Sequence, residues 1–327
     1  MDAALRQACQ GAAERTLEWL LAQLHSETGL GDDLAAHYKA PALLQLAGRP
    51  REARQLLDRI AARFQQANGD FLSRPELRTA DPVLAAYPAY MTGWIAMAAQ
   101  RIGRFDLSLP AWRWLQNFWL ETPGGFCLEP CGTGQGAILE LLTCAHLGLA
   151  ALHFGDLERA RGAGRTLQRF LDQQPSPADS FYLRMSPDGQ LQTRYPQEAR
   201  LLHRVAAREP GQAWFFIGYP MAFLCRLHQA TGEASALATA RGYAAFAEAC
   251  GPQLVAEPFA HKVAWGCAEL AALTGAAAPQ ALSTAIVQQL LQSQNADGSW
   301  LAEAPFNTRI DQSVEIAIWL LEVRALG

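Results

Sequence analysis

Apolar residues recur every three or four positions along almost the whole chain, which gives each segment one apolar face. This spacing is the pattern of amphipathic α-helices. Gly, Pro, Asn and Asp interrupt it at intervals, as at Gly48-Arg-Pro50 and Gly155-Asp156. The pattern predicts helices near residues 2–26, 34–47, 50–67, 83–102, 106–121, 134–154, 156–174, 211–231, 233–250, 258–275, 278–294 and 311–325.

The connections between these helices alternate in length. Single glycines or Gly-Arg turns join some pairs, and long loops join others, near residues 68–82, 122–133 and 175–210. A ring of outer and inner helices needs this alternation, because its long loops gather over one central opening, where binding and chemistry usually lie. We therefore expect residues 1–327 to form one all-α domain, an (α/α)6 toroid of six helical hairpins.

One segment departs from the helical pattern. Residues 181–185 and 190–195 flank Pro187-Asp-Gly189, and Asp-Gly is a strong hairpin turn. We predict a small β-hairpin insert near 181–195, which can serve as a lid or be a surface decoration. Arg184 in its first arm is a candidate substrate-binding residue.

The long loops share a repeated motif: a Gln at a helix end, then a Gly turn, then an aromatic residue. Its three copies are Gln66 to Phe71, Gln116 to Phe126, and Gln292-Ser-Gln-Asn-Ala-Asp-Gly-Ser-Trp300. The amide can satisfy open carbonyls at the helix end while the aromatic ring packs beneath the next helix.

This motif resembles the QW-type repeat of terpenoid cyclases and protein prenyltransferase β-subunits, whose fold is an α/α toroid. The same scaffold hosts six-hairpin glycosidases, polysaccharide lyases and sugar epimerases, so the resemblance implies the fold without a reaction. The chain lacks the Asp-x-Asp-Asp acid motif of triterpene cyclases, for which Gly31-Asp-Asp33 is a poor substitute. It also lacks the Asp, Cys and His zinc ligands of prenyltransferases in their expected context.

Charge and cysteine usage narrow the class of protein. The formal net charge of −4 gives no basic footprint for nucleic acid, and no apolar stretch approaches the length of a membrane span. No secretory signal is visible, and the seven cysteines are scattered along the chain. These features predict a cytoplasmic protein with free thiols, no nucleic-acid partner and no membrane span, and they leave its oligomeric state open.

Polar residues collect where the predicted inner helices begin, so a toroid would bring them to one opening beside the positive ends of the helices. We expect acid or base catalysis from Glu129, His261, Asp311 and His37. Asp311 is alternatively a helix cap, and His261 a core residue on an apolar helix. The residues expected to bind substrate are Lys39, Tyr87, Cys131, Arg184, Trp214, Tyr219, Trp265 and Arg309.

Only two lysines occur among the 27 basic residues, and both fall at predicted inner-helix starts. These are Lys39 and Lys262, and their placement favours a role for a compact ammonium group. Because neighbouring residues on a helix point about 100° apart, we expect His261, and not Lys262, to face the central opening.

We expect no metal and no cofactor. Cys127-x-x-x-Cys131 has no second cysteine pair to complete a zinc site. Gly132-Thr-Gly-Gln-Gly136 follows no strand and lacks the Lys of a phosphate loop, so it predicts a helix entry that Thr133 and Gln135 would open.

The leading interpretation is an enzyme that binds a small molecule and catalyses the cyclisation, isomerisation or a related rearrangement of a largely apolar metabolite. Its mechanism would be acid and base chemistry in an aromatic-lined cavity, without a metal. The first alternative is a carbohydrate-active hydrolase, lyase or epimerase of the six-hairpin type. The second is a non-enzymatic binding or scaffold protein.

Overall fold

The structure of the protein is a computed structural model that describes residues 1–132 and 137–327. Thr133 and Gln135, expected to open a helix, lie outside the described residues. The chain forms two compact units. The split unit joins residues 2–117 to residues 290–324, and the central unit holds residues 118–289 with Met1 and residues 325–327.

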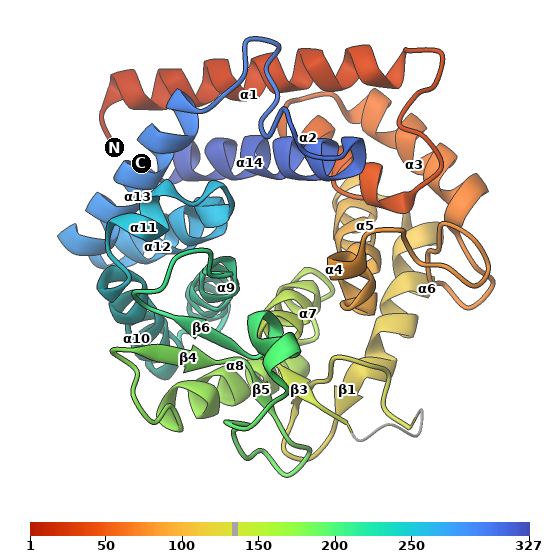
Figure 1. The fold of residues 1–327 in the computed structure, drawn as a ribbon. Helices are drawn as coiled ribbons and strands as arrows, with labels where there is room; N and C mark the ends of the chain where they lie inside the picture. Colours follow the sequence, from red (N-terminus) through yellow and green to blue (C-terminus); the bar gives the residue numbers. More distant parts are fainter. Residues whose placement is uncertain (133–136) are drawn as a thin grey trace. The chain divides into compact units, whose positions relative to one another are not determined.

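The split unit is built from helices of both ends of the chain (Figure 1). In order, these are α1 (Ala3–Leu24), the 3-10 turn η1 (Leu34–Ala36), α2 (Ala40–Leu46), α3 (Pro50–Phe64), the short α4 (Pro82–Ala85), α5 (Pro88–Ile102), α6 (Phe105–Leu115) and α14 (Phe306–Leu326). A further 3-10 turn, η2 (Gln116–Phe118), ends the first stretch.

The central unit holds the remaining helices and the short strands. The helices are α7 (Leu141–His153), α8 (Leu157–Asp172), η3 (Gln197–Leu202), α9 (Phe215–Thr231), α10 (Ala234–Ala249), α11 (Pro252–Ala256), η4 (Pro258–Ala260), α12 (His261–Thr274) and most of α13 (Ala277–Gln292). The strands form antiparallel pairs: β1 (Trp119–Leu120) with β2 (Gly125–Phe126), β3 (Leu139–Glu140) with β5 (Arg184–Met185), and β4 (Ser180–Tyr182) with β6 (Arg204–Ala206).

Two kinds of helix alternate along the chain. Outer helices such as α3 and α8 bury one stripe and carry charged residues elsewhere, whereas α5, α7 and α12 are buried through most of their length. A helix that is apolar all round belongs inside a fold, and an amphipathic one covers it. The alternation of inner and outer helices expected from the sequence is therefore confirmed.

The β-hairpin near 181–195 is only partly as predicted. Its turn exists, since Ser186 N donates to Gln190 O at 2.9 Å, and Met185 and Leu191 form a bridge. The strands themselves pair elsewhere, β4 with β6 and β5 with β3. The reason is burial: those pairings bring together fully buried residues, whereas much of the second arm of the hairpin is exposed and polar.

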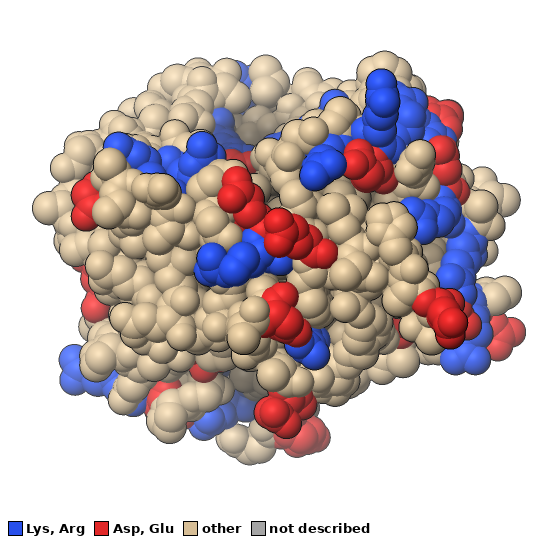
Figure 2. Space-filling view, turned by 90° about the horizontal axis from the view of Figure 1, so that it is seen from above, with Lys and Arg blue, Asp and Glu red and all other residues tan. Residues whose placement is uncertain are grey.

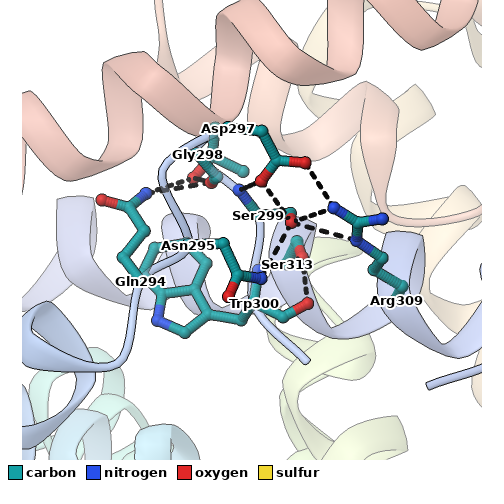
Figure 3. Close-up of polar contacts among 9 residues, drawn as sticks. Gln294, Asn295, Asp297, Gly298, Ser299, Trp300, Arg309 and Ser313 are labelled. Carbon is teal, nitrogen blue, oxygen red and sulfur yellow. Dashed lines mark hydrogen bonds and ion pairs between the residues drawn. The ribbon is translucent and has the colours of Figure 1, made fainter. Parts of the chain in front are cut away.

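The last copy of the Gln-Gly-aromatic motif joins α1 to α14 (Figure 3). Trp300 is 1% exposed; its indole Nε1 donates to Leu290 O at 2.8 Å, and its backbone N donates to Ser313 Oγ at 2.8 Å. Gln294, rather than the predicted Gln292, donates to Ala12 O and Gly298 O, each at 2.9 Å.

Gly298 is required at the turn of this motif. Its φ is +91°, and an added Cβ would lie 2.5 Å from the carbonyl oxygen of Arg15. Phe71 and Phe126, the aromatic residues of the other two copies, are also fully buried. The repeat thus serves the scaffold, as its resemblance implied.

The two terminal residues lie together, as expected: a Cβ on Gly327 would lie 2.9 Å from that of Met1 (Figure 1). On the face shown in Figure 2, acidic and basic side chains are interspersed, without a broad field of one sign. In the part of the chain that the structure describes, no helix has the length and hydropathy needed to cross a bilayer.

Candidate active site

A buried cluster of three charged side chains lies between α2, α5 and α14 of the split unit. Lys39 Nζ donates to Glu315 Oε2 at 2.5 Å and lies 2.8 Å from Asp311 Oδ1. The side chains of Lys39, Asp311 and Glu315 are 2%, 5% and 0% exposed. Asp311 is therefore the member that reaches nearest to solvent.

The local sequence explains how these groups meet. Asp311 and Glu315 are four residues apart on α14, so they share one face of that helix. Lys39 immediately precedes α2, and Pro41 in the first turn of that helix fixes where it begins. The ammonium thus reaches both carboxylates from the opposite side.

Aromatic rings surround the ammonium group. Lys39 Nζ lies 5.0 Å from the ring centre of Tyr38, 5.5 Å from that of Tyr90 and 5.9 Å from that of Trp94. Such distances allow cation–π attraction, which is strong where water is excluded. Tyr90 OH and Trp319 Nε1 also donate to Glu315 Oε1, each at 3.2 Å.

The two carboxylates differ in their partners. Glu315 accepts hydrogen bonds on both oxygens, so its negative charge is well compensated. Asp311 Oδ2 accepts from Gln312 Nε2 at 2.6 Å, and Asp311 Oδ1 pairs with Lys39 Nζ at 2.8 Å. The Tyr38 hydroxyl group also interacts with the Asp311 carboxylate. Asp311 thus has fewer well-formed hydrogen bonds than Glu315.

Burial sets the protonation of the cluster. It raises the pKa of Asp311, an effect that the charge of Glu315 reinforces and the ammonium of Lys39 opposes. Burial alone would lower the pKa of Lys39, but the two carboxylates outweigh it and raise that pKa. A charged lysine beside two buried carboxylates leaves one negative charge uncompensated, and this excess negative charge acts with burial to raise the pKa of Asp311.

A second polar pair lies in the central unit, at the start of α12. His261 and Lys262 are 1% and 4% exposed, and Lys262 Nζ lies 3.1 Å from His261 Nε2. His261 Nδ1 lies 3.1 Å from Pro258 O, which can only accept, so these contacts assign the proton to Nδ1. From the helix geometry we expected the side chains of His261 and Lys262 to point in different directions. Their ends are in contact, because the flexible side chain of Lys262 bends back toward the imidazole of His261.

Two other candidates for acid and base chemistry lie outside both groups. Glu129 is exposed in the loop between Cys127 and Cys131. His37 is buried against the ring of Phe64, with Nε2 3.0 Å from Gly31 O. Burial lowers the pKa of His37.

Some of the residues expected to bind substrate have contacts that stabilise the fold. Arg309 bonds Ser299 and Asp297 in the Trp300 turn (Figure 3). Trp214 Nε1 donates to Ala206 O at 3.0 Å, and Trp265 Nε1 donates to Glu269 Oε1 at 3.1 Å.

The remaining candidates are spread over other elements. Tyr219 packs edge-on against Trp265, with ring centres 5.5 Å apart. Tyr87 is buried just before α5, and Arg184 lies opposite Glu140 in the β3–β5 pair. The Sγ atoms of Cys131 and Cys127 are 3.6 Å apart. Among the described residues, no group of three or more His, Cys, Asp and Glu side chains is arranged to hold a metal ion.

Comparison with known proteins gives matches in structure only. No family model matches the sequence, and no curated protein matches it either. A crystal structure of D-mannose isomerase matches with a TM-score of 0.68 and 11% identity, covering 98% of this chain and 99% of that chain.

Two other solved structures cover nearly the whole chain. An inactive variant of an α-1,6-mannanase from Salegentibacter sp. HEL1_6, in complex with α-1,6-mannotetrose, matches with a TM-score of 0.64 and 14% identity over 98% of this chain and 99% of that chain. Unsaturated glucuronyl hydrolase from Bacillus sp. GL1 matches with a TM-score of 0.59 and 15% identity over 98% of this chain and 96% of that chain.

These matches support the α/α toroid fold that the repeat motif implied. They do not support the resemblance to terpenoid cyclases, because the matched proteins are named as sugar-processing enzymes. At such low identity the likeness extends to the fold and not to the reaction. The chain has the all-α fold of an α/α toroid with small β inserts.

Proposed function

We propose that the protein is a carbohydrate-active enzyme that transfers protons on a sugar at the Lys39–Asp311–Glu315 cluster. The sequence favoured an apolar metabolite first and a carbohydrate second; the matches to a mannose isomerase, a mannanase and a glucuronyl hydrolase support the second. The observation that carries the proposal is a buried carboxyl with raised pKa, in contact with a buried ammonium.

The arrangement favours isomerisation or epimerisation over hydrolysis. In most glycosidases two carboxyl groups flank the glycosidic bond from different sides. Here Asp311 and Glu315 project from one face of α14 onto the same ammonium, so they cannot flank a bond. One acid beside one cation suits proton transfer to a carbonyl oxygen whose developing negative charge the cation stabilises.

Each member of the cluster then has a role. Asp311 in its acid form donates its proton to the carbonyl oxygen of an open-chain sugar, and the carboxylate that remains takes the hydrogen from the neighbouring carbon, which leaves an enediol. The same carboxyl group then returns a proton to one of the two enediol carbons and takes the proton of one enediol hydroxyl group as the product carbonyl forms, so Asp311 ends in its acid form. Lys39 stabilises the oxygen as it gains negative charge. Glu315 is a positioning residue that holds the ammonium in place through its hydrogen bond.

A hydrolase with an adjacent acid pair is the alternative that the mannanase match raises, since its inactive variant has alanine in place of two neighbouring aspartates. The only adjacent acid pair in this chain is Asp32–Asp33. Asp33 accepts hydrogen bonds from Ala35 N, Ala80 N and Ser73 Oγ, and Asp32 pairs with Arg63. These contacts make the pair part of the loop scaffold.

Proton NMR in D2O tests the proposal. The purified protein is incubated with aldoses, ketoses, mannobiose and an unsaturated glucuronyl disaccharide. Isomerisation or epimerisation exchanges the hydrogen beside the carbonyl for deuterium, whereas hydrolysis releases reducing ends without that exchange. We expect exchange, and a fall in kcat of about 100-fold or more in Asp311→Asn, the usual range for a general acid.

The matched control is Asp172→Asn, which changes an exposed aspartate at the end of α8. It should keep wild-type turnover. Release of reducing ends without exchange, no turnover of any sugar in the panel, or an Asp311→Asn variant as active as Asp172→Asn would each contradict the proposal.

A further inference from the structure

A pocket of about 570 Å³ opens in the split unit, within the size range of small-molecule sites. Its walls come from the chain before η1, the end of α3, the loop 73–80 and the first turn of α14. The lining residues are Asp32, Asp33, Arg63, Ser73, Arg74, Leu77, Ala80 and Asn307.

Two stretches of chain lead from this pocket to the buried cluster. Asn307, Asp311 and Glu315 follow one another at intervals of four residues, so they lie along one face of α14 at steps of about 6 Å. On the opposite side, Asp33 caps η1, and Lys39 follows three residues after that turn. The pocket therefore adjoins the end of the cluster at which Asp311 lies.

Part of the pocket wall is fixed by its own hydrogen bonds. Asp33 Oδ1 accepts from Ala35 N at 3.0 Å and Ser73 Oγ at 3.0 Å, and its Oδ2 accepts from Ala80 N at 2.7 Å. These bonds hold the loop 73–80 against the start of η1. The wall exists before any ligand arrives.

Other lining groups are available to a ligand. Within the described parts of the chain, the side chains of Arg74 and Asn307 make no hydrogen bond or ion pair, and Arg74 is exposed. A guanidinium and a carboxamide suit hydroxyl groups, since together they offer several donors and an acceptor. Leu77 adds an apolar surface for the C–H face of a ring.

The charge of the lining indicates the class of ligand. Asp32 and Asp33 balance Arg63 and Arg74, so the pocket carries no formal net charge. A balanced set of charged groups favours a neutral, hydroxyl-rich ligand over an anion, which would face two carboxylates.

We propose that this pocket binds a second, neutral sugar unit, so that the substrate is a disaccharide or longer saccharide whose reacting unit lies at Asp311. This inference rests on the proposed function for the identity of the reacting unit. The two sites share one substrate because the face of α14 that forms the pocket wall continues into the cluster.

Direct binding tests the inference without any turnover. Saturation-transfer NMR and calorimetry compare mannobiose, cellobiose and maltose with mannose and glucose, on the wild type and on Arg74→Ala and Asn307→Ala. We expect at least one disaccharide to bind the wild type about tenfold or more tightly than its monosaccharide, a difference of about 1.4 kcal/mol. Each substitution should remove most of that difference and leave monosaccharide binding unchanged.

Arg51→Ala is the matched control, because Arg51 is an exposed arginine of α3 outside the pocket lining. It should bind all the sugars as the wild type does. Equal affinity for disaccharides and monosaccharides, or disaccharide binding unchanged by Arg74→Ala and Asn307→Ala, would overturn the inference.

The two proposals can fail separately. If disaccharides bind more tightly in a way that depends on Arg74, but the protein exchanges no hydrogen in D2O, the proposed second sugar site stands and the proposed reaction is wrong. If hydrogen exchange depends on Asp311 but disaccharides bind no more tightly than monosaccharides, the proposed reaction stands and the proposed second sugar site is wrong.

Discussion

Asp311 is surrounded by groups that move its pKa in opposite directions. Burial and the carboxylate of Glu315 raise it, and the ammonium of Lys39 lowers it. If the acid form is the active one, activity is present below the pKa of Asp311 and is lost as the pH rises through it. The variants Glu315→Gln and Lys39→Met should therefore move this alkaline limb in opposite directions.

Glu315→Gln removes a negative neighbour and should move the limb to lower pH; Lys39→Met removes a positive one and should move it to higher pH. The measurement is kcat/KM against pH on a sugar that the protein turns over. Glu303→Gln, an exposed glutamate, is the control and should keep the wild-type profile. A shift of both variants in the same direction would show that another group titrates.

The stability of the cluster should be strongly non-additive. Lys39→Met leaves two buried carboxylates without their cation and should cost about 3–5 kcal/mol of unfolding free energy. Adding Glu315→Gln leaves only Asp311, which can take up a proton, so the double variant should recover part of the loss. Urea denaturation measures both, and a double variant whose loss equals the sum of the single losses would argue against charge coupling.

Some of these residues could be selected from sequence and others could not. The scarcity of lysine and the polar helix starts pointed to Lys39 and Asp311. Glu315 lies in the predicted helix 311–325 but was not named as a candidate, because its pairing with Lys39 spans 276 positions and leaves no local pattern. Arg309 was selected as a substrate-binding residue because it lies at a helix start, as Asp311 does. In the structure its guanidinium instead contacts Ser299 and Asp297 in the Trp300 turn.

At the scale of elements, Asp33 joins η1 to the loop 73–80. Its hydrogen bonds outweigh the effect of burial and lower its pKa. A lowered carboxyl pKa contributes stability above the unfolded value, and this contribution is lost as the pH falls through the folded value. Asp33→Ala should therefore destabilise the protein near neutral pH by about 1–3 kcal/mol, the usual cost of losing hydrogen bonds to a charged group.

The difference between wild type and Asp33→Ala should narrow in acid, which thermal unfolding at a series of pH values can follow. Asp32→Ala is the neighbouring control: its side chain is 89% exposed, so we expect little change. A difference that stays constant down to acid pH would show that Asp33 acts through packing rather than charge.

Helices were predictable because their signal is local. The 3.6-residue period and the Gly and Pro boundaries located the long helices, but several boundaries were wrong. The predicted helix 106–121 runs past the end of α6 at Leu115 into β1, and α14 begins at Phe306 rather than near 311. The start of α7 also differs from the prediction, beside the residues that are not described. Strand pairing was not predictable, since Arg184–Met185 pairs with Leu139–Glu140 some 45 residues earlier. Periodicity shows which residues are apolar, but not which distant strand will cover them.

For the molecule as a whole, the seven cysteines are free, and Cys131 is the one that is not buried. Burial raises the pKa of Cys9 to about 11 and those of Cys225 and Cys250 to about 12, so these thiols contain little thiolate at neutral pH. A thiol reagent should react quickly with about one group in the native protein and with all seven after unfolding without reductant. Five groups in the unfolded count would indicate a bond such as Cys127–Cys131.

The composition of the split unit has a consequence for synthesis on the ribosome. The central unit is nearly continuous in sequence and can fold while the chain is still growing. Lys39 emerges from the ribosome 276 positions before Glu315, with which it pairs. Until α14 has been synthesised, the ammonium group of Lys39 lacks the carboxylates of Asp311 and Glu315 and stays exposed or loosely packed. The proposed catalytic centre thus forms only after the central unit has been synthesised, and a chain that ends before Asp311 would be inactive in the proposed reaction.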